Sequence, residues 1–266
     1  MSEDGERRVT LNWRSHFHMM VAFAVALASL ACPAATPTYV ARDAALRSLP
    51  LYFYPASGRP KAVVVFFGND VGFWDAHDRL ARRFASVGFT VIGMDVKEYV
   101  SRLPEPYQRR EAAFDSSIDG IIARAVREMN ADSLPLILGG HSFGADIALW
   151  TAVHAPPPRT VGVLALSPTA RSHFYVTTMD RANIEEPQEP GSFSVAEEIS
   201  AVPPNMRIAL LRGSGDHRRG IDSVLQAAGK PRLRYTVIPF ASHSLKSLTL
   251  AGPMAESALG WILAGN

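Results

Sequence analysis

The chain has 266 residues, of which 47% are apolar, and its 27 basic and 25 acidic residues give a formal net charge of +2. This size and apolar content are sufficient for one large α/β core. The near balance of charge, with no cluster of Lys and Arg interleaved with aromatic residues, argues against nucleic-acid binding. The chain has no zinc or calcium ligand spacing, so we expect no metal site.

The first 31 residues have the three-part pattern of a secretory signal peptide. Arg7, Arg8 and Arg14 come before an apolar stretch at 19–30, and small residues follow, with a cleavage pattern that ends at Ala31. The apolar stretch is too short for a comfortable membrane span. We therefore predict that the protein is exported and that residues 1–31 are removed.

Two alternatives for the N-terminus stay open. Cys32 is the only cysteine and would be the first residue after cleavage, so it could carry a lipid anchor. Leu30 lies one position closer to Cys32 than a good lipobox leucine should. The other alternative is an uncleaved N-terminal anchor.

Strand-like and helix-like segments alternate through the rest of the chain, which we predict to be one domain at 38–266. Apolar runs rich in β-branched residues predict strands at 51–54, 61–68, 89–95, 134–139, 161–166, 207–211 and 233–239. Apolar residues at helical spacing predict helices at 74–87, 107–130, 145–150 and 248–263. This alternation implies right-handed crossovers and an α/β fold, a mostly parallel sheet with helices on both faces.

The sequence Gly-His-Ser-Phe-Gly at 140–144 has the spacing of a nucleophile elbow, a sharp strand-to-helix turn that exposes a serine. A strand-like run comes before it and a helix-like run follows. The two glycines remove side chains where the strand and the helix crowd each other, and the helix directs its positive end at the reacting centre. We predict Ser142 as a nucleophile and the backbone N–H of Phe143 as an oxyanion donor.

A second oxyanion donor is expected from the loop that follows the 61–68 strand. The backbone N–H of Asn69 is the preferred donor, with Asp70 next. The Asp70 carboxylate would repel an oxyanion, so its side chain should cap the next helix or face a cationic group of the substrate. Asp95 is interpreted as a turn residue, and Asp146 as a local cap or partner.

An elbow serine needs a base and an orienting acid, and in this class of fold the acid and then the histidine follow the serine along the chain. Among eight histidines, His243 follows the last predicted strand, where a loop can bring it over the elbow. Asp216 ends the preceding strand on a glycine-rich turn and would fix the imidazole tautomer. Asp222 is the competing acid, and the alternative role for Asp216 is to cap the helix that follows.

Several of these stretches resemble the bacterial virulence protein VirJ and the C-terminal domain of AcvB, a family of exported α/β-hydrolase-like proteins. The sequence GHSFGAD at 140–146 is similar to that family's G-Y-S-F-G-A-D, and 67–74 is similar, at lower quality, to its S-G-D-G-G-W loop. Further stretches that fit are 91–95, followed by Tyr99, Ser101 and Arg102, and the stretch 166–176. Departures are a glycine-poorer oxyanion loop, His141 in place of Tyr, and the lack of cysteines often seen in the family.

The resemblance covers most of 61–266 and implies an α/β-hydrolase fold. It implies a periplasmic serine hydrolase that needs no cofactor and cleaves an aminoacyl-phospholipid such as lysyl-phosphatidylglycerol through an acyl-serine. It also makes a membrane surface and secretion-system proteins the expected partners. A hydrolase-like binding protein with an inert triad, assisting secretion or envelope assembly, and a general carboxylesterase stay as alternatives.

An insertion at 169–205 lies between two predicted strands, where such folds carry a lid. Its two basic residues are Arg171 and Arg181, and its acidic residues are Asp180, Glu185, Glu186, Glu189, Glu197 and Glu198. An acidic lid would favour a cationic acyl group such as lysyl, although a solvated acidic loop is the plainer alternative. Aromatic residues that would line an apolar groove, or else pin the lid, are Phe174, Tyr175 and Phe193.

Overall fold

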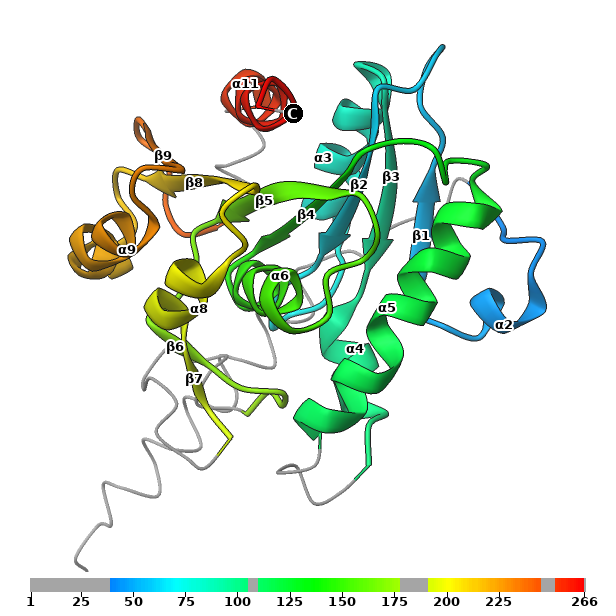
Figure 1. The fold of residues 1–266 in the computed structure, drawn as a ribbon, viewed down its shortest axis with the longest axis horizontal. Coiled ribbons are helices and arrows are strands. Elements are labelled where there is room, and N and C mark those ends of the chain that lie inside the picture. The colour runs from blue at the N-terminus through cyan, green and yellow to red at the C-terminus, as the bar shows by residue number, and fades with distance from the viewer. Residues whose placement is uncertain (1–38, 105–109, 178–190, 245–251, 266) are drawn as a thin grey trace, which may run out of the picture.

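The computed structural model describes residues 39–104, 110–177, 191–244 and 252–265 (Figure 1). The predicted signal peptide and Cys32 therefore lie outside the described residues. Within the described residues, none of the helices combines the length and the apolar character needed to cross a bilayer.

Seven strands form one sheet in the order β1-β3-β2-β4-β5-β8-β9, and β1 alone runs antiparallel to its neighbour. The strands are β1 (Leu51–Tyr54), β2 (Ala62–Phe67), β3 (Phe89–Met94), β4 (Leu136–His141), β5 (Thr160–Leu166), β8 (Arg207–Gly213) and β9 (Leu233–Ile238). Each predicted strand is present, with its ends shifted by no more than a few residues. The predicted mostly parallel sheet is confirmed.

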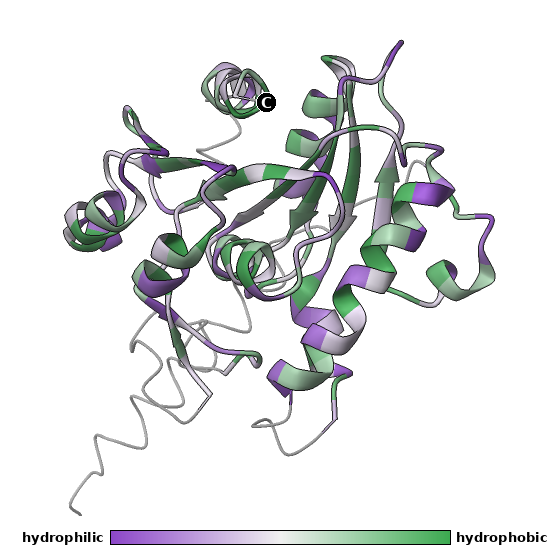
Figure 2. Ribbon diagram, viewed as in Figure 1, coloured by the Kyte–Doolittle hydropathy of each residue, from purple (hydrophilic) through white to green (hydrophobic). Residues whose placement is uncertain are grey.

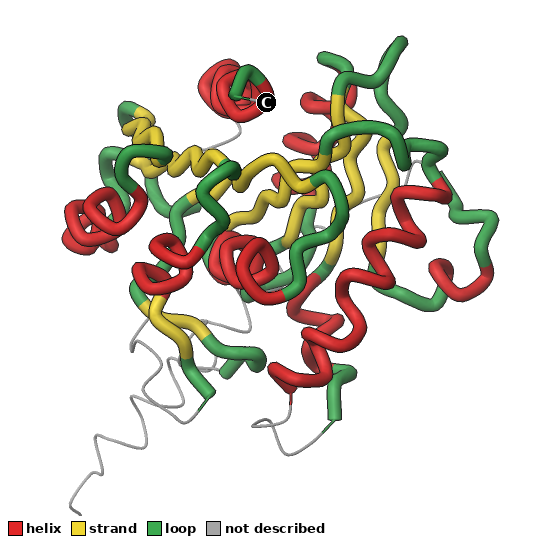
Figure 3. The backbone as a smooth tube through the Cα atoms, in the orientation of Figure 1, coloured by secondary structure: helices red, strands yellow, loops and turns green. Residues whose placement is uncertain are grey.

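Helices cover both faces of this sheet (Figures 1 and 3). One face packs against α3 (Asp75–Ser86) and α11 (Gly252–Leu263). The other packs against α5 (Arg110–Glu128), α6 (Phe143–His154), α8 (Val195–Ala201) and α9 (Asp222–Gly229). These pairings place the sheet between two apolar layers.

The side chains of β2 show how the sequence builds the two layers. Val63, Val65 and Phe67 belong to the core on the α6 side, whereas the alternate residues belong to the core on the α3 side. This division follows from the two-residue period of a strand. All six residues of β2 are buried, as the continuous apolar run predicts. Figure 2 shows hydrophobic residues along the central strands and hydrophilic stretches on the outer turns of α5.

The sequence analysis missed short helices, because a helix of one or two turns is too short to show a periodic pattern of apolar residues. The helices α2 (Ala44–Arg47) and α4 (Val96–Ser101) begin at Asp43 and Asp95, whose carboxylates accept N–H groups of the first turn. Asp95 also accepts the N–H of Phe73 at 3.0 Å. Asp95 therefore caps a helix, whereas the sequence analysis interpreted it as a turn residue.

The insertion at 169–205 is described only at its two ends. Its flanks pair as a two-stranded ribbon, β6 (Arg171–Ser172) with β7 (Phe193–Ser194), and α8 follows directly. Four of its predicted lid acids, together with Arg181, lie outside the described residues. The β6–β7 pairing therefore holds the two ends of the insertion together.

Candidate active site

Ser142 occupies the turn between β4 and α6 in a strained backbone conformation. Its φ and ψ are 52° and −122°, an uncommon region for a residue with a side chain. The backbone N–H of Ser142 donates to Leu166 of β5 at 2.8 Å, which holds the turn to the sheet. The serine is thus fixed at the carboxyl end of the sheet and at the N-terminus of a helix, as an elbow requires.

The two glycines beside Ser142 are required by backbone contacts. A Cβ atom at Gly140 would lie 2.1 Å from the carbonyl oxygen of Gly144. A Cβ atom at Gly144 would lie 2.0 Å from the carbonyl oxygen of Gly68, in the loop after β2. Since backbone atoms cannot yield as a flexible side chain does, only glycine fits at either position.

A chain of hydrogen bonds links Ser142 to His243 and Asp216. Nε2 of His243 lies 2.9 Å from Oγ of Ser142, and Nδ1 of His243 lies 3.0 Å from Oδ2 of Asp216. An ionised carboxylate can only accept hydrogen bonds, so Nδ1 of His243 carries the proton. Nε2 of His243 therefore accepts a hydrogen bond from the hydroxyl of Ser142. The structure thus brings together the three residues chosen from the sequence.

Asp216 also caps the short helix that follows it. Oδ1 accepts the N–H of Arg218 at 2.9 Å, whereas Oδ2 faces His243. The capping hydrogen bond and the hydrogen bond with His243 therefore use different oxygens of one carboxylate. Burial raises the pKa of Asp216, but hydrogen bonds from His243 and Arg218 and the nearby positive charge outweigh it, so the pKa lies well below its usual range.

Arg212 is a site residue that the sequence analysis missed. Its guanidinium is fully buried and donates to Asp216 at 3.0 Å, to Asp222 at 2.9 Å and to the carbonyl of Pro168 at 2.8 Å. Asp222, the competing acid, binds Arg212 and the hydroxyl of Tyr235 rather than a histidine. The signal that could have found Arg212 is a charged residue inside the apolar run of β8.

His141 is a second residue that the sequence analysis did not use. Its imidazole is buried, and Nε2 donates to the backbone carbonyl of His243 at 2.8 Å. Burial lowers the pKa of His141 to about 3, with the neighbouring His243 acting in the same direction. His141 is therefore neutral at physiological pH, and it holds the loop that carries His243 through the main chain of that loop.

The predicted oxyanion donors come from two adjacent strands. Phe143 is the first residue of α6, where N–H groups have no partner within the helix. Asn69 follows β2, which pairs with β4 in a register that sets Phe67 opposite Gly140. This loop lies directly against the elbow, since a Cβ atom at Gly144 would be only 2.0 Å from the carbonyl oxygen of Gly68.

Asp70 lies half-buried in the same loop, four positions before the N-cap residue of the next helix. The N-cap residue of α3 is Trp74, and its N–H donates to Nδ1 of His77 at 3.2 Å. A histidine side chain therefore takes the N–H at the start of this helix. A role in substrate binding stays a prediction.

Phe174 packs inside the core, so the groove-lining role expected for it is corrected. Only 2% of its surface is exposed, and its ring lies 5.0 Å from Phe114, 4.8 Å from Trp150 and 5.7 Å from Phe193. This arrangement fits the alternative in which the aromatic residues pin the insertion. The half-buried Tyr175 stacks on His173 at 3.7 Å.

Asp146 and Glu198 anchor the two ends of the insertion. Asp146 is buried and accepts both the N–H and the hydroxyl of Thr169, at 2.9 and 2.6 Å. Glu198 is buried beside His154 at 3.0 Å, and burial raises its pKa. Of the predicted lid acids that the structure describes, only Glu197 is therefore exposed.

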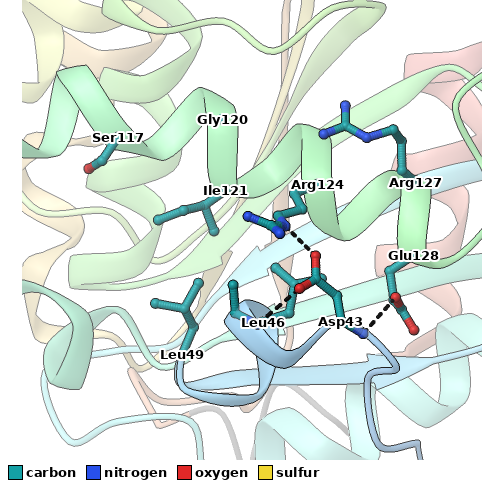
Figure 4. A pocket seen from close by; sticks show the side chains of 10 residues that line it. Asp43, Leu46, Leu49, Ser117, Gly120, Ile121, Arg124, Arg127 and Glu128 are labelled. Atoms are coloured by element: carbon teal, nitrogen blue, oxygen red, sulfur yellow. Dashed lines mark hydrogen bonds and ion pairs between the residues drawn. The ribbon is translucent and has the colours of Figure 1, made fainter.

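An open groove of about 850 Å³ lies between α2 and α5 (Figure 4). Asp43 and Arg124 form an ion pair across it, and Glu128 accepts the N–H of Asp43. None of the predicted catalytic residues lines this groove. Among the described residues, no group of three His, Cys, Asp or Glu side chains is placed to hold a metal ion.

The sheet order and the elbow define an α/β-hydrolase fold. Esterases and lipases are among the solved structures with this fold. Similar structures include TT1662 from Thermus thermophilus, 20% identical with a TM-score of 0.55, covering 81% of this chain and 94% of that one. Thermogutta terrifontis esterase 2 phosphonylated by sarin is 16% identical, with a TM-score of 0.54 and coverages of 80% and 89%. A soluble variant of monoglyceride lipase from Saccharomyces cerevisiae is 13% identical, with a TM-score of 0.53 and coverages of 84% and 98%.

The sequence model of the bacterial virulence protein (VirJ) family matches residues 61–223, more than half of the chain. The chain therefore belongs to this family, and the predicted fold and family are confirmed. No curated protein matches the chain in sequence.

Proposed function

We propose that this chain is a serine hydrolase that cleaves a carboxylic ester through an acyl-serine intermediate. The observation that carries the proposal is the continuous hydrogen-bonded chain from Oγ of Ser142 through His243 to Asp216, on a strained elbow. A binding protein would not need a serine in this conformation beside an imidazole nitrogen that can accept its proton.

In the proposed reaction, Oγ of Ser142 attacks the ester carbonyl while Nε2 of His243 takes its proton. Asp216 stabilises the imidazolium, and the N–H groups of Phe143 and Asn69 hold the oxyanion. His243 returns the proton to the departing alcohol. Water then attacks the acyl-serine with His243 again as the base, which releases the acid and restores Ser142.

The proposed substrate is an aminoacyl-phospholipid such as lysyl-phosphatidylglycerol, met at a membrane surface after export. Support comes from membership of the VirJ family, the elbow extension at 140–146 and the signal-peptide pattern of residues 1–31. A general carboxylesterase is the competing function, and secretion-system proteins stay proposed partners.

The proposal is tested by intact-protein mass after treatment with a fluorophosphonate. We expect one adduct on the wild type and none on Ser142→Ala. Ser167→Ala is a matched control, because Ser167 is also buried, directly follows the next strand and has a positive φ of 50°. The control should keep the adduct.

A folded wild type that gains no adduct would contradict the serine hydrolase and favour the binding protein. If the adduct forms, hydrolysis of lysyl-phosphatidylglycerol vesicles is compared with hydrolysis of short-chain esters. Turnover of the short esters alone would favour the general carboxylesterase. Turnover that persists in Ser142→Ala would rule out Ser142 as the nucleophile.

A further inference from the structure

Two buried histidines lie side by side next to the proposed catalytic base. His77 projects from α3 and His141 ends β4, and neither exposes more than 1% of its surface. The ring centroids of His77 and His141 are 5.7 Å apart, and those of His141 and His243 are 5.5 Å apart. The three imidazoles therefore form a row that runs from the inside of the protein to Ser142.

The outer hydrogen bonds of the row fix the tautomer of each buried ring. The N–H of Trp74 donates to Nδ1 of His77, so the proton of a neutral His77 must lie on Nε2. The carbonyl of His243 can only accept, so the proton of His141 lies on its Nε2. Nδ1 of His141 then carries a lone pair.

The two remaining ring nitrogens are complementary. Nε2 of His77 and Nδ1 of His141 are both buried, and neither has a hydrogen-bond partner. The tautomers make the first a donor and the second an acceptor, on adjacent rings. Leaving a buried donor and a buried acceptor unpaired is costly, so a small movement of the two rings that joins them is favourable. Each nitrogen lies at its ring's edge, so their gap can be much shorter than the centroid distance.

We propose that Nε2–H of His77 donates to Nδ1 of His141, and that this pair makes His141 a positioning residue for His243. A continuous chain then runs from the N–H of Trp74 through His77 and His141 to the carbonyl of His243. It ties the first turn of α3 to the loop that carries the base. Burial lowers the pKa of both His77 and His141, so both rings stay neutral at physiological pH and the chain does not change with protonation.

The hydrogen bond is tested by nuclear magnetic resonance on the whole protein with ¹⁵N-labelled histidine. Near neutral pH we expect both rings as neutral Nε2–H tautomers, with a coupling across the hydrogen bond between Nε2 of His77 and Nδ1 of His141. An Nδ1–H tautomer at either ring, or no coupling in a well-resolved spectrum, would overturn the pairing. This readout does not depend on any enzymatic activity.

The positioning role rests on the proposed function and is tested with a pair of variants of equal bulk. His141→Tyr keeps a hydroxyl that can donate to the carbonyl of His243, whereas His141→Phe does not. We expect the rate of fluorophosphonate labelling to fall about tenfold in the Phe variant and to recover most of that loss in the Tyr variant. Circular dichroism confirms that both are folded.

A second readout follows the base itself, through the proton resonance of the bond between Nδ1 of His243 and Asp216. This resonance should exchange faster in His141→Phe than in His141→Tyr. Equal labelling rates and equal resonances in the two folded variants would overturn the positioning role. Failure of the wild type to label would instead count against the proposed function, while the coupling measurement still decides the His77–His141 bond.

Discussion

Arg212 and His243 donate hydrogen bonds to the same oxygen atom of Asp216, Oδ2, each at 3.0 Å. The shared oxygen lies between a buried guanidinium and the imidazole, so the carboxylate is held in one orientation. Arg212 is held in turn by Asp222 and by the carbonyl of Pro168. The position of His243 is therefore set by a network that reaches from the loop after β5 to α9.

This network allows a matched test of Asp216. Asp216→Asn and Asp222→Asn each leave Arg212 with one carboxylate. Of the two substituted positions, only 216 faces His243. An amide at 216 can donate to Nδ1 of His243, which would move the proton to Nε2 and prevent it from accepting the proton of Ser142. Fluorophosphonate labelling should fall roughly 10³–10⁴-fold in Asp216→Asn.

In Asp222→Asn, labelling should fall less than about tenfold, because the tautomer of His243 is unchanged. The rates are measured on folded protein at one pH. Equal loss in both variants would show that the carboxylates act only through Arg212, and that Asp216 has no separate role at the base.

Gly144→Ala should distort the elbow. Its Cβ atom would meet the carbonyl oxygens of Gly68 and Phe67 at 2.0 and 2.4 Å, so the start of α6 must move away from β2. We expect loss of labelling and a clear fall in the free energy of unfolding, measured with urea. Gly120→Ala in α5 is the control, since a Cβ atom there meets nothing within 4 Å.

The control should be neutral or more stable by up to about 1 kcal/mol, because alanine favours a helix more than glycine does. If Gly144→Ala labels at the wild-type rate, the close approach of α6 to the loop after β2 is not needed for the reactive serine.

His141 predicts how stability depends on pH. The pKa of His141 in the folded state is about 3, below the ordinary histidine value of about 6.5. Between these two values the unfolded chain binds a proton at His141 and the folded chain does not. The free energy of unfolding should therefore fall as pH falls below about 6.5, with a contribution from this residue approaching 1.4 kcal/mol per pH unit.

Urea unfolding between about pH 7.5 and pH 5 measures this slope above the range where most carboxylates titrate. His141→Phe should reduce the slope by about 1.4 kcal/mol per pH unit at the acid end. His77 shifts in the same direction and stays in the variant, so part of the slope should persist. An unchanged slope would contradict a buried, neutral His141.

Phe174 can be tested as a core residue rather than a groove residue. Phe174→Ala should cost about 3–5 kcal/mol of unfolding free energy, because it empties space beside Phe114 and Trp150. Phe240→Ala removes a ring that is 100% exposed, and it should change stability by less than about 0.5 kcal/mol. Similar small effects on urea unfolding in both variants would restore Phe174 as a candidate for lining a groove.

The sequence by itself determined the parallel sheet, the elbow and the choice of Ser142, Asp216 and His243. Each of these rests on a local signal: an apolar run, a glycine spacing, or the chain order of residues that end strands. The requirement for glycine at 140 is local as well, since a Cβ atom there would meet the carbonyl oxygen of Gly144, four residues away. The requirement at Gly144 is not local, because a Cβ atom there would meet the loop after β2.

The tertiary structure decided what surrounds those residues. Arg212 between two aspartates, His141 beneath the base and Phe174 in the core all depend on contacts between residues far apart in the chain. His141 and His243 are 102 positions apart. No periodicity or spacing in the sequence indicates that the imidazole of His141 contacts the backbone carbonyl of His243. Burial and charge pairing arise only when strands lie side by side, so residue type alone does not reveal them.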